Sequence, residues 1–188
     1  MSELQIRDAK LIQYLNEAYG KEKELETALQ AHIGMAIRDA YKKRLKDHLK
    51  ETKDHARQLD RRIKKLGGKA EAGPLPEAVK DVAQAAQTAT KKAAALAQGP
   101  MHAARGLSPA EKQLKNAKTE YSEEHEEIAN YTAIETLAEA VGDAETAKLA
   151  RDIRRDEERM AKFLAGQITV MSKQVAREEV PSAQRNTR

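Results

Sequence analysis

The sequence predicts an all-α fold, a four-helix bundle built from two antiparallel helix pairs. Its composition is that of long helices, because charged residues make up 34%, aromatic residues make up only 3%, and Trp is absent. Apolar residues also recur at steps of three and four in four separate stretches, the spacing of helices that pack in bundles. The chain has 188 residues, 40% of them hydrophobic, so we expect one domain over 1–176 and a flexible tail over 177–188.

The first helix pair is expected between residue 4 and Leu66. One helix runs from about residue 4 into the thirties, where Gly34 can bend or end it. The next covers 39–66 and ends at Gly67-Gly68, since glycine readily adopts the backbone that closes a helix. The stripe of this second helix has regular spacing and consists of Leu45, Leu49, Thr52, Ala56, Leu59, Ile63 and Leu66.

A long connection, residues 67–108, should join the two pairs. Pro74 and Pro76 indicate a loop, and the Ala-rich stretch 77–98 predicts an extra helix in the crossover. Two close pairs with one long connection are typical of a bundle with a single crossover.

The second pair begins with a clear start signal, the segment Ser108–Glu111 (SPAE). Ser is a preferred N-cap, Pro suits the first helical position, and Glu three residues after the cap completes a capping box. This helix should end before Gly142. Asp143 can then cap the last helix, which we expect to end in the mid-170s.

Three of the four helices place a glutamate where the spacing requires an apolar residue. These residues are Glu22, Glu124 and Glu157. Unpaired ionised carboxylates are strongly destabilising in a core, and a cluster of them adds repulsion. Two divalent cations would balance four carboxylates, and oxygen ligands with one or two imidazoles suit iron or manganese. The pattern therefore predicts a buried metal centre.

The second helix carries its polar candidates along the border of its stripe. His48, Glu51 and His55 share one face because they lie at i, i+3 and i+7. Glu51 would be the carboxylate and either histidine the nitrogen donor. Both histidines could instead be surface residues on a basic helix.

A repeated motif links the first and third helices. Tyr19-x-x-Glu22 matches Tyr121-x-x-Glu124, and each tyrosine would either pack in the core or hydrogen-bond the nearby carboxylate. Glu158 is one residue out of register with Glu157 and is kept as its substitute. His32 has no partner by spacing and is expected to be structural or exposed.

Four stretches resemble the ferritin-like superfamily and, within it, the YciF/YciE-type stress-protein family. They are YGKEKELETAL (19–29), HLKETKDHARQL (48–59), EEHEEIANYTAIETLAEAVGD (123–143) and RRDEERMAKFL (154–164). The resemblance implies a ferritin-like bundle, often dimeric, with a dimetal site. The ligand carboxylates that it implies are Glu22, Glu51, Glu124 and Glu157, with Glu127 completing a Glu-x-x-Glu motif.

The sequence also departs from the superfamily, which has Glu-x-x-His on its second and fourth helices. Here Asp54 stands at the histidine position after Glu51, with His55 one place late. Met160 stands at that position after Glu157, so one imidazole is missing from the pattern.

The predicted function is metal handling or a stress response by a cytoplasmic homodimer that binds two ions of iron or manganese. As a catalyst it would oxidise ferrous iron or consume peroxide. The alternative is a non-enzymatic structural or protective bundle with a degenerate metal site, which Met160 favours.

Composition and charge exclude several other kinds of site and partner. The absence of Cys excludes disulfides, thiolate metal sites and cysteine nucleophiles, and it favours a reducing compartment. No apolar run approaches the roughly 18 residues of a membrane span. The net charge of +4 arises mainly in residues 42–66, with eleven Lys and Arg against four Asp and Glu. Association with nucleic acid would therefore be weak and non-specific.

Overall fold

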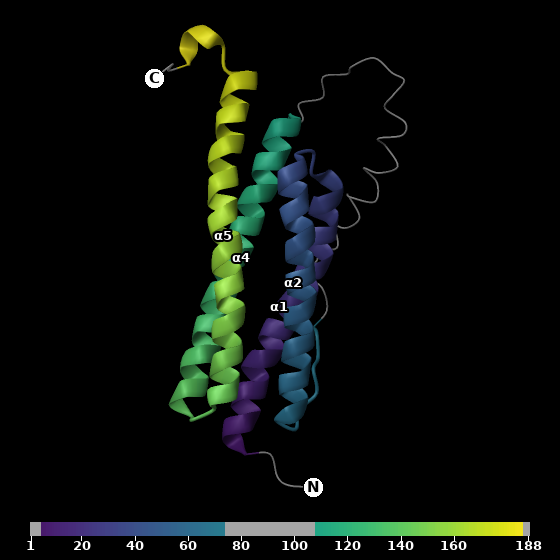
Figure 1. Ribbon diagram of the computed structural model, residues 1–188, viewed down its shortest axis with the longest axis vertical. Coiled ribbons are helices and arrows are strands. Elements are labelled where there is room, and N and C mark those ends of the chain that lie inside the picture. Colours follow the sequence, from purple (N-terminus) through teal and green to yellow (C-terminus); the bar gives the residue numbers. More distant parts are fainter. Residues whose placement is uncertain (1–4, 74–107, 186–188) are drawn as a thin grey trace.

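Four long helices form two antiparallel pairs in the computed structural model, which describes residues 5–73 and 108–185 (Figure 1). The helices are α1 (Ile6–Met35), α2 (Asp39–Lys65), α4 (Pro109–Ala140) and α5 (Ala144–Glu179). Helix α1 packs against α2 and α4 against α5, while α1 also contacts α4 and α2 contacts α5. The predicted all-α four-helix bundle is confirmed. The helix predicted at 77–98 lies outside the described residues.

Most helix ends occur at the predicted signals. The Ser108 side chain accepts from the N–H of Glu111, and the Glu111 side chain accepts from the N–H of Ser108, so the capping box is complete. Asp143 caps α5 by accepting from the N–H of Thr146. Gly67 and Gly142 follow α2 and α4 with φ angles of 87° and 75°, a conformation that side chains disfavour.

Helix α5 continues to Glu179, past the predicted end in the mid-170s. Residues 176–179 (AREE) are good helix formers, so nothing stops the helix before Pro181. Proline restricts the residue before it to extended backbone, and Val180 has φ −103° and ψ 127°. A short 3-10 helix, Ser182–Gln184, follows. Part of the segment predicted as a tail is therefore helical.

The buried surface of α2 is wider than its predicted stripe. Ala56 and Ile63 are buried as predicted, whereas Leu49 and Leu66 are only half-buried. The central line of the buried face consists of Tyr41, Leu45, His48, Thr52, His55, Leu59 and Arg62. The middle of this line is polar, with His48, Thr52 and His55, and apolar residues lie on either side of it, with Tyr41 and Leu45 before and Leu59 after.

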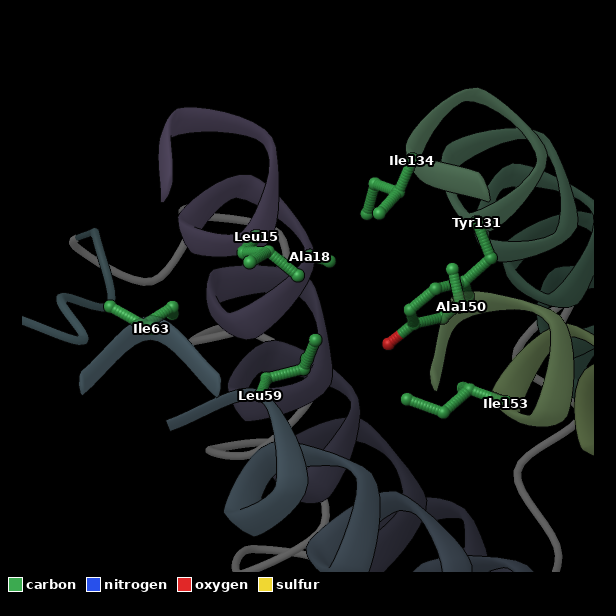
Figure 2. Close-up of a cluster of buried hydrophobic side chains, with 8 residues drawn as sticks. All are labelled: Leu15, Ala18, Leu59, Ile63, Tyr131, Ile134, Ala150 and Ile153. Carbon is green, nitrogen blue, oxygen red and sulfur yellow. The ribbon is translucent and has the colours of Figure 1, made fainter. Parts of the chain in front are cut away.

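Two apolar clusters lie on either side of the polar middle of the bundle. The first cluster, shown in Figure 2, consists of Leu15, Ala18, Leu59, Ile63, Tyr131, Ile134, Ala150 and Ile153. The second consists of Leu29, Ala36, Tyr41, Leu45, Ala117, Met160, Leu164 and Met171. Along each helix, the predicted carboxylates and histidines fall between the residues of these two clusters.

Among the described residues, no helix combines the length and the apolar character that crossing a bilayer would require.

Candidate metal centre

Two groups of buried polar side chains meet at Glu157 on α5. Its Oε1 lies 2.9 Å from Nδ1 of His55, and its Oε2 lies 3.6 Å from Nε2 of His48. Glu22 Oε1 lies 3.4 Å from the same nitrogen of His55, and Glu124 Oε1 lies 3.0 Å from that of His48. The result is one group of Glu22, His55 and Glu157 and a second of His48, Glu124 and Glu157. In each group, the possible ligand atoms lie within 4.8 Å of one another.

All four bundle helices contribute to these two groups. The carboxylates come from α1, α4 and α5, and both imidazoles come from α2. His48 and His55 are seven residues apart, about two helical turns, so they point to the same side of α2. The burial predicted for Glu22, Glu124 and Glu157 is confirmed, since each is at most 1% exposed.

Glu127 adds a fourth buried carboxylate, one turn beyond Glu124 on α4. Burial raises the pKa of Glu127 well above its usual value, and the negative charges of Glu22 and Glu157 raise it further. Among the described residues, its Oε1 has no hydrogen-bond partner. Glu127 therefore belongs to the same electrostatic cluster as the two groups.

Charges within the cluster shift the pKa values of its members in different directions. Burial raises the pKa of Glu124 to about 8, although His48 opposes this. Burial disfavours the imidazolium form of both histidines, but the surrounding carboxylates still raise the pKa of His48 to about 10 and that of His55 to about 11. The pKa of Glu157 is lowered despite burial, because it contacts both imidazoles. Protons thus supply much of the positive charge that the carboxylates require.

The donor set fits divalent cations. In the described part of the chain, several buried oxygens of the cluster lack a hydrogen-bond partner: Oε2 of Glu22, Oε2 of Glu124, Oε1 of Glu127 and Oε2 of Glu157. Buried polar atoms are rarely left in this state, so the cluster has ligand atoms to spare. Four carboxylates and two imidazoles suit first-row divalent ions such as iron and manganese.

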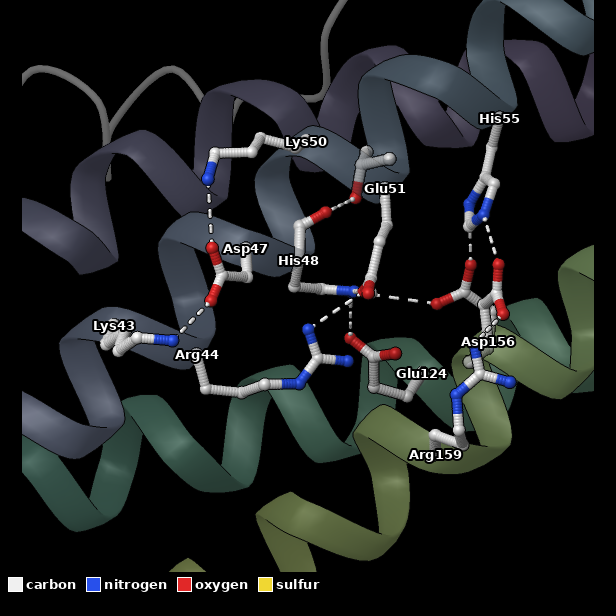
Figure 3. A network of polar contacts seen from close by, with 12 residues as sticks. Lys43, Arg44, Asp47, His48, Lys50, Glu51, His55, Glu124, Asp156 and Arg159 are labelled. Carbon is white, nitrogen blue, oxygen red and sulfur yellow. Dashed lines mark hydrogen bonds and ion pairs between the residues drawn. The ribbon is translucent and has the colours of Figure 1, made fainter.

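A carboxylate outside the cluster contacts the remaining nitrogen of each histidine (Figure 3). Nδ1 of His48 lies 3.1 Å from Oε2 of Glu51, and Nε2 of His55 lies 3.1 Å from Oδ2 of Asp156. Arg44 donates to Glu51 at 2.8 Å, and Arg159 pairs with Asp156.

Glu51, predicted as a metal ligand, therefore lies on the outer side of His48. Its side chain is 33% exposed. Burial opposes ionisation of Glu51, but the hydrogen bonds from His48 and Arg44 lower its pKa to about 2. The sequence motif placed Glu51 on the same face as the histidines without showing which of the three residues points to the centre.

Three other predicted residues lie apart from the cluster. Glu158 is exposed and pairs with Arg154, so Glu157 is the residue of the two that faces inward. Tyr19 is half-buried and packs against the first apolar cluster. Tyr121 is also half-buried, with its ring edge-on to His125 at 4.4 Å between centroids.

The tyrosine that contacts the cluster is Tyr131, which donates to Oε1 of Glu22. Burial raises the pKa of Tyr131 well above its usual value, and the charge of Glu22 adds to the shift. The spacing contains a usable signal, since Tyr131 follows Glu124 by seven residues and so shares its face.

A second buried polar group, the triad His32, Tyr41 and Glu120, was not predicted. Nδ1 of His32 lies 2.6 Å from Oε1 of Glu120, and the hydroxyl of Tyr41 donates to Oε2 of Glu120 at 2.7 Å. All three are at most 4% exposed. Glu120 lies one turn before Glu124 on the same face of α4, which is the signal that could have identified it.

Comparison with protein families gives a match over almost the whole chain. The family model described as "Domain of unknown function (DUF892)" matches residues 7–178. None of the curated proteins gives a significant match.

Solved structures of similar fold include ferritin-like bundles. A protein of Xanthomonas campestris aligns with a TM-score of 0.68 and 24% identity over 93% of this chain and 99% of that one. The bacterioferritin of Desulfovibrio desulfuricans, described with a diiron site, aligns with a TM-score of 0.64 and 18% identity over 92% and 86%. The E. coli stress protein YciF aligns with a TM-score of 0.63 and 19% identity over 90% and 98%. At these identities, the comparison demonstrates the ferritin-like fold.

Proposed function

The chain belongs to the DUF892 family and is a ferritin-like protein of the YciF type, and from this we propose that it binds two divalent ions, iron or manganese, inside the bundle. The observation that carries the proposal is the position of Glu157, whose two oxygens face the two histidines. Glu157 would contribute one oxygen to each of two positions. Glu22 and His55 would complete one position, and Glu124 and His48 would complete the other.

Other residues of the chain would support the two positions. Glu127 would supply a further oxygen, since it is buried beside the same carboxylates. Tyr131 would hold Glu22 in place through its hydroxyl. The two apolar clusters would keep water away from both sides and so strengthen the attraction between ligands and ions.

Bound iron or manganese would supply redox chemistry, namely the oxidation of ferrous iron or the reduction of peroxide, in metal handling or protection from stress. The described bacterioferritin has a diiron site, and YciF is a stress protein, which supports this assignment.

A second candidate is a structural or protective bundle that holds no metal. The raised pKa values of His48 and His55 support it, because two imidazolium ions partly neutralise the four carboxylates. Met160 also supports it, since this residue is buried in the second apolar cluster and offers no strong ligand to the centre.

Metal analysis of the purified full chain separates the two candidates. After supplementation with iron or manganese and removal of loosely bound ions, we expect about two ions per chain, because the cluster contains two groups of possible ligands that have Glu157 in common. Glu157→Ala should bind almost none. The matched control is Glu158→Ala, which changes the adjacent exposed residue and should bind like the wild type. Less than one ion per wild-type chain would favour the metal-free candidate.

A further inference from the structure

Each buried histidine of the centre is contacted at both ring nitrogens, and the inward nitrogen differs between the two. His48 directs Nε2 to Glu124 and Glu157 and directs Nδ1 to Glu51. His55 directs Nδ1 to Glu22 and Glu157 and directs Nε2 to Asp156. The nitrogen that faces the core is therefore Nε2 in His48 and Nδ1 in His55.

This difference in the inward nitrogen has a direct consequence for coordination. A neutral imidazole binds a metal through the nitrogen that has a free lone pair, and its other nitrogen carries the proton. A carboxylate cannot donate when ionised, so it accepts this proton in a hydrogen bond and fixes which nitrogen is free. Contacts on the outer side of each ring thus decide how its inner side can bind.

The two outer carboxylates are themselves held in place. Glu51 accepts from Arg44 through the same oxygen that faces His48, and Asp156 pairs with Arg159 through its other oxygen. Both carboxylates are accessible to water, with side chains 33% and 28% exposed. Because water can solvate both groups, they suit the role of a hydrogen-bond acceptor better than that of a ligand of the buried cluster.

Helix α5 contacts His55 from two sides through consecutive residues. Glu157 meets Nδ1 inside the bundle, while Asp156 meets Nε2 nearer the surface. Adjacent helical residues project about 100° apart, so one turn of α5 can reach both edges of a ring that lies between them. His48 has the equivalent arrangement with residues from different helices, Glu51 on α2 and Glu124 on α4.

We infer that Glu51 and Asp156 are positioning residues of the metal centre, which fix His48 to bind through Nε2 and His55 to bind through Nδ1. This inference rests on the proposed function and adds the assignment of the two nitrogens. It also gives Glu51 a role other than that of a ligand.

The first experiment uses Zn²⁺ alone as a diamagnetic probe in the ¹⁵N-labelled full chain. Long-range ¹H–¹⁵N correlation spectra of the imidazoles identify the protonated nitrogen and the metal-bound nitrogen of each ring. We expect His48 to carry its proton on Nδ1 and His55 on Nε2. The same bound nitrogen in both rings, or the reverse assignment, would overturn the inference.

The second experiment measures Zn²⁺ affinity by competition with a chelator. Glu51→Ala and Asp156→Ala should each weaken binding about 10–100-fold, because loss of a partner outside the metal ligands typically has this effect. Glu51→Gln and Asp156→Asn keep an acceptor oxygen without the charge, so they should bind with intermediate affinity. The metal-free amide variants should have the wild-type helical content, which separates positioning from folding.

Two control variants change carboxylates that contact neither histidine. The first is Asp47→Asn, since Asp47 lies one turn from Glu51 on α2 and pairs with Lys43 and Lys50. The second is Glu158→Gln, since Glu158 lies beside Glu157 on α5 and pairs with Arg154. Both should bind Zn²⁺ as the wild type does. If all four Glu51 and Asp156 variants bind Zn²⁺ with the affinity of the wild type, only this inference is overturned. A wild-type chain that binds no Zn²⁺, iron or manganese would overturn the proposed function as well.

Discussion

Glu157 contacts His48 and His55 at once, with one carboxylate oxygen directed to each ring. The two groups of buried polar residues therefore have one member in common, and their other members are separate. Variants of the separate members should consequently have different effects from variants of Glu157.

Removing one carboxylate from each group should remove one ion at a time. Glu22→Ala should leave the position of His48 and Glu124 able to bind, and Glu124→Ala should leave the position of His55 and Glu22. Each variant should bind about one ion per chain, which is half of the number expected for the wild type. Elemental analysis after dialysis measures this. Loss of both ions from Glu22→Ala would show that the positions are not independent.

Metal binding should stabilise the bundle strongly. A ligand that binds only the folded state at 100 times its dissociation constant adds about 2.7 kcal/mol to the free energy of unfolding. The free energy of unfolding from urea denaturation should be higher in Mn²⁺ than in excess chelator, by about this amount for each saturated position. The Glu157→Ala variant is the control, because its stability should not depend on the chelator. An equal midpoint for wild type in both conditions would contradict the proposed function.

The triad His32, Tyr41 and Glu120 should behave as a buried ion pair. Burial opposes protonation of His32, but Glu120 raises its pKa, so Glu120→Leu would leave the buried imidazole of His32 and the hydroxyl of Tyr41 without their common partner. We expect this change to cost about 3–5 kcal/mol, and the triple replacement His32→Leu, Tyr41→Phe, Glu120→Leu to be close to neutral. Urea denaturation measures both. Glu126→Leu, at an ion pair with Lys21 in which the carboxylate side chain is 59% exposed, should cost less than about 1 kcal/mol.

Asp143 should contribute to stability in two separable ways, as the cap of α5 and as a partner of Arg62. Asn also caps helices well, so Asp143→Asn removes the charge and retains the cap, whereas Asp143→Ala removes both. The free energy of unfolding should be about 1 kcal/mol lower for Asp143→Ala than for Asp143→Asn. Thermal or urea unfolding at neutral pH measures it.

Acid should remove the charge contribution of Asp143. Burial opposes ionisation, but bonds from the Thr146 N–H and Arg62 lower the pKa of Asp143 below its unfolded value of 3.8. Its stabilisation is therefore fully present above that value and is lost as the pH falls through the lower pKa of the folded state. The difference in the free energy of unfolding between the wild type and Asp143→Asn should become smaller below about pH 4. A gap that stays constant into acid would contradict the assigned pairing.

The sequence predicted the fold well because the decisive signals were local. The capping box at Ser108, the glycines after α2 and α4, and the regular apolar spacing all act within one or two turns. The buried positions of Glu22, Glu124 and Glu157 were also found this way, since each interrupts a stripe of apolar neighbours.

The polar side of α2 could not be resolved by the same means. The buried line of α2 contains apolar residues as well as His48 and His55, and Glu51 lies one residue away from it, so periodicity alone could not separate Glu51 from the histidines. The choice depends on Glu124 and Glu157, which are distant in sequence. The partners of His32 are equally distant, since Glu120 lies on α4. Local spacing carries no information about such pairs.

The division of donor atoms among the helices has a consequence for engineering. Every nitrogen of the cluster comes from α2, and every carboxylate comes from the other three helices. In the proposed metal centre, the preference between intermediate transition metals and hard cations would therefore depend on two positions of a single helix. Replacing His48 and His55 with Asn would present an all-oxygen cage and shift selectivity toward Mg²⁺ or Ca²⁺, with α1, α4 and α5 left unaltered.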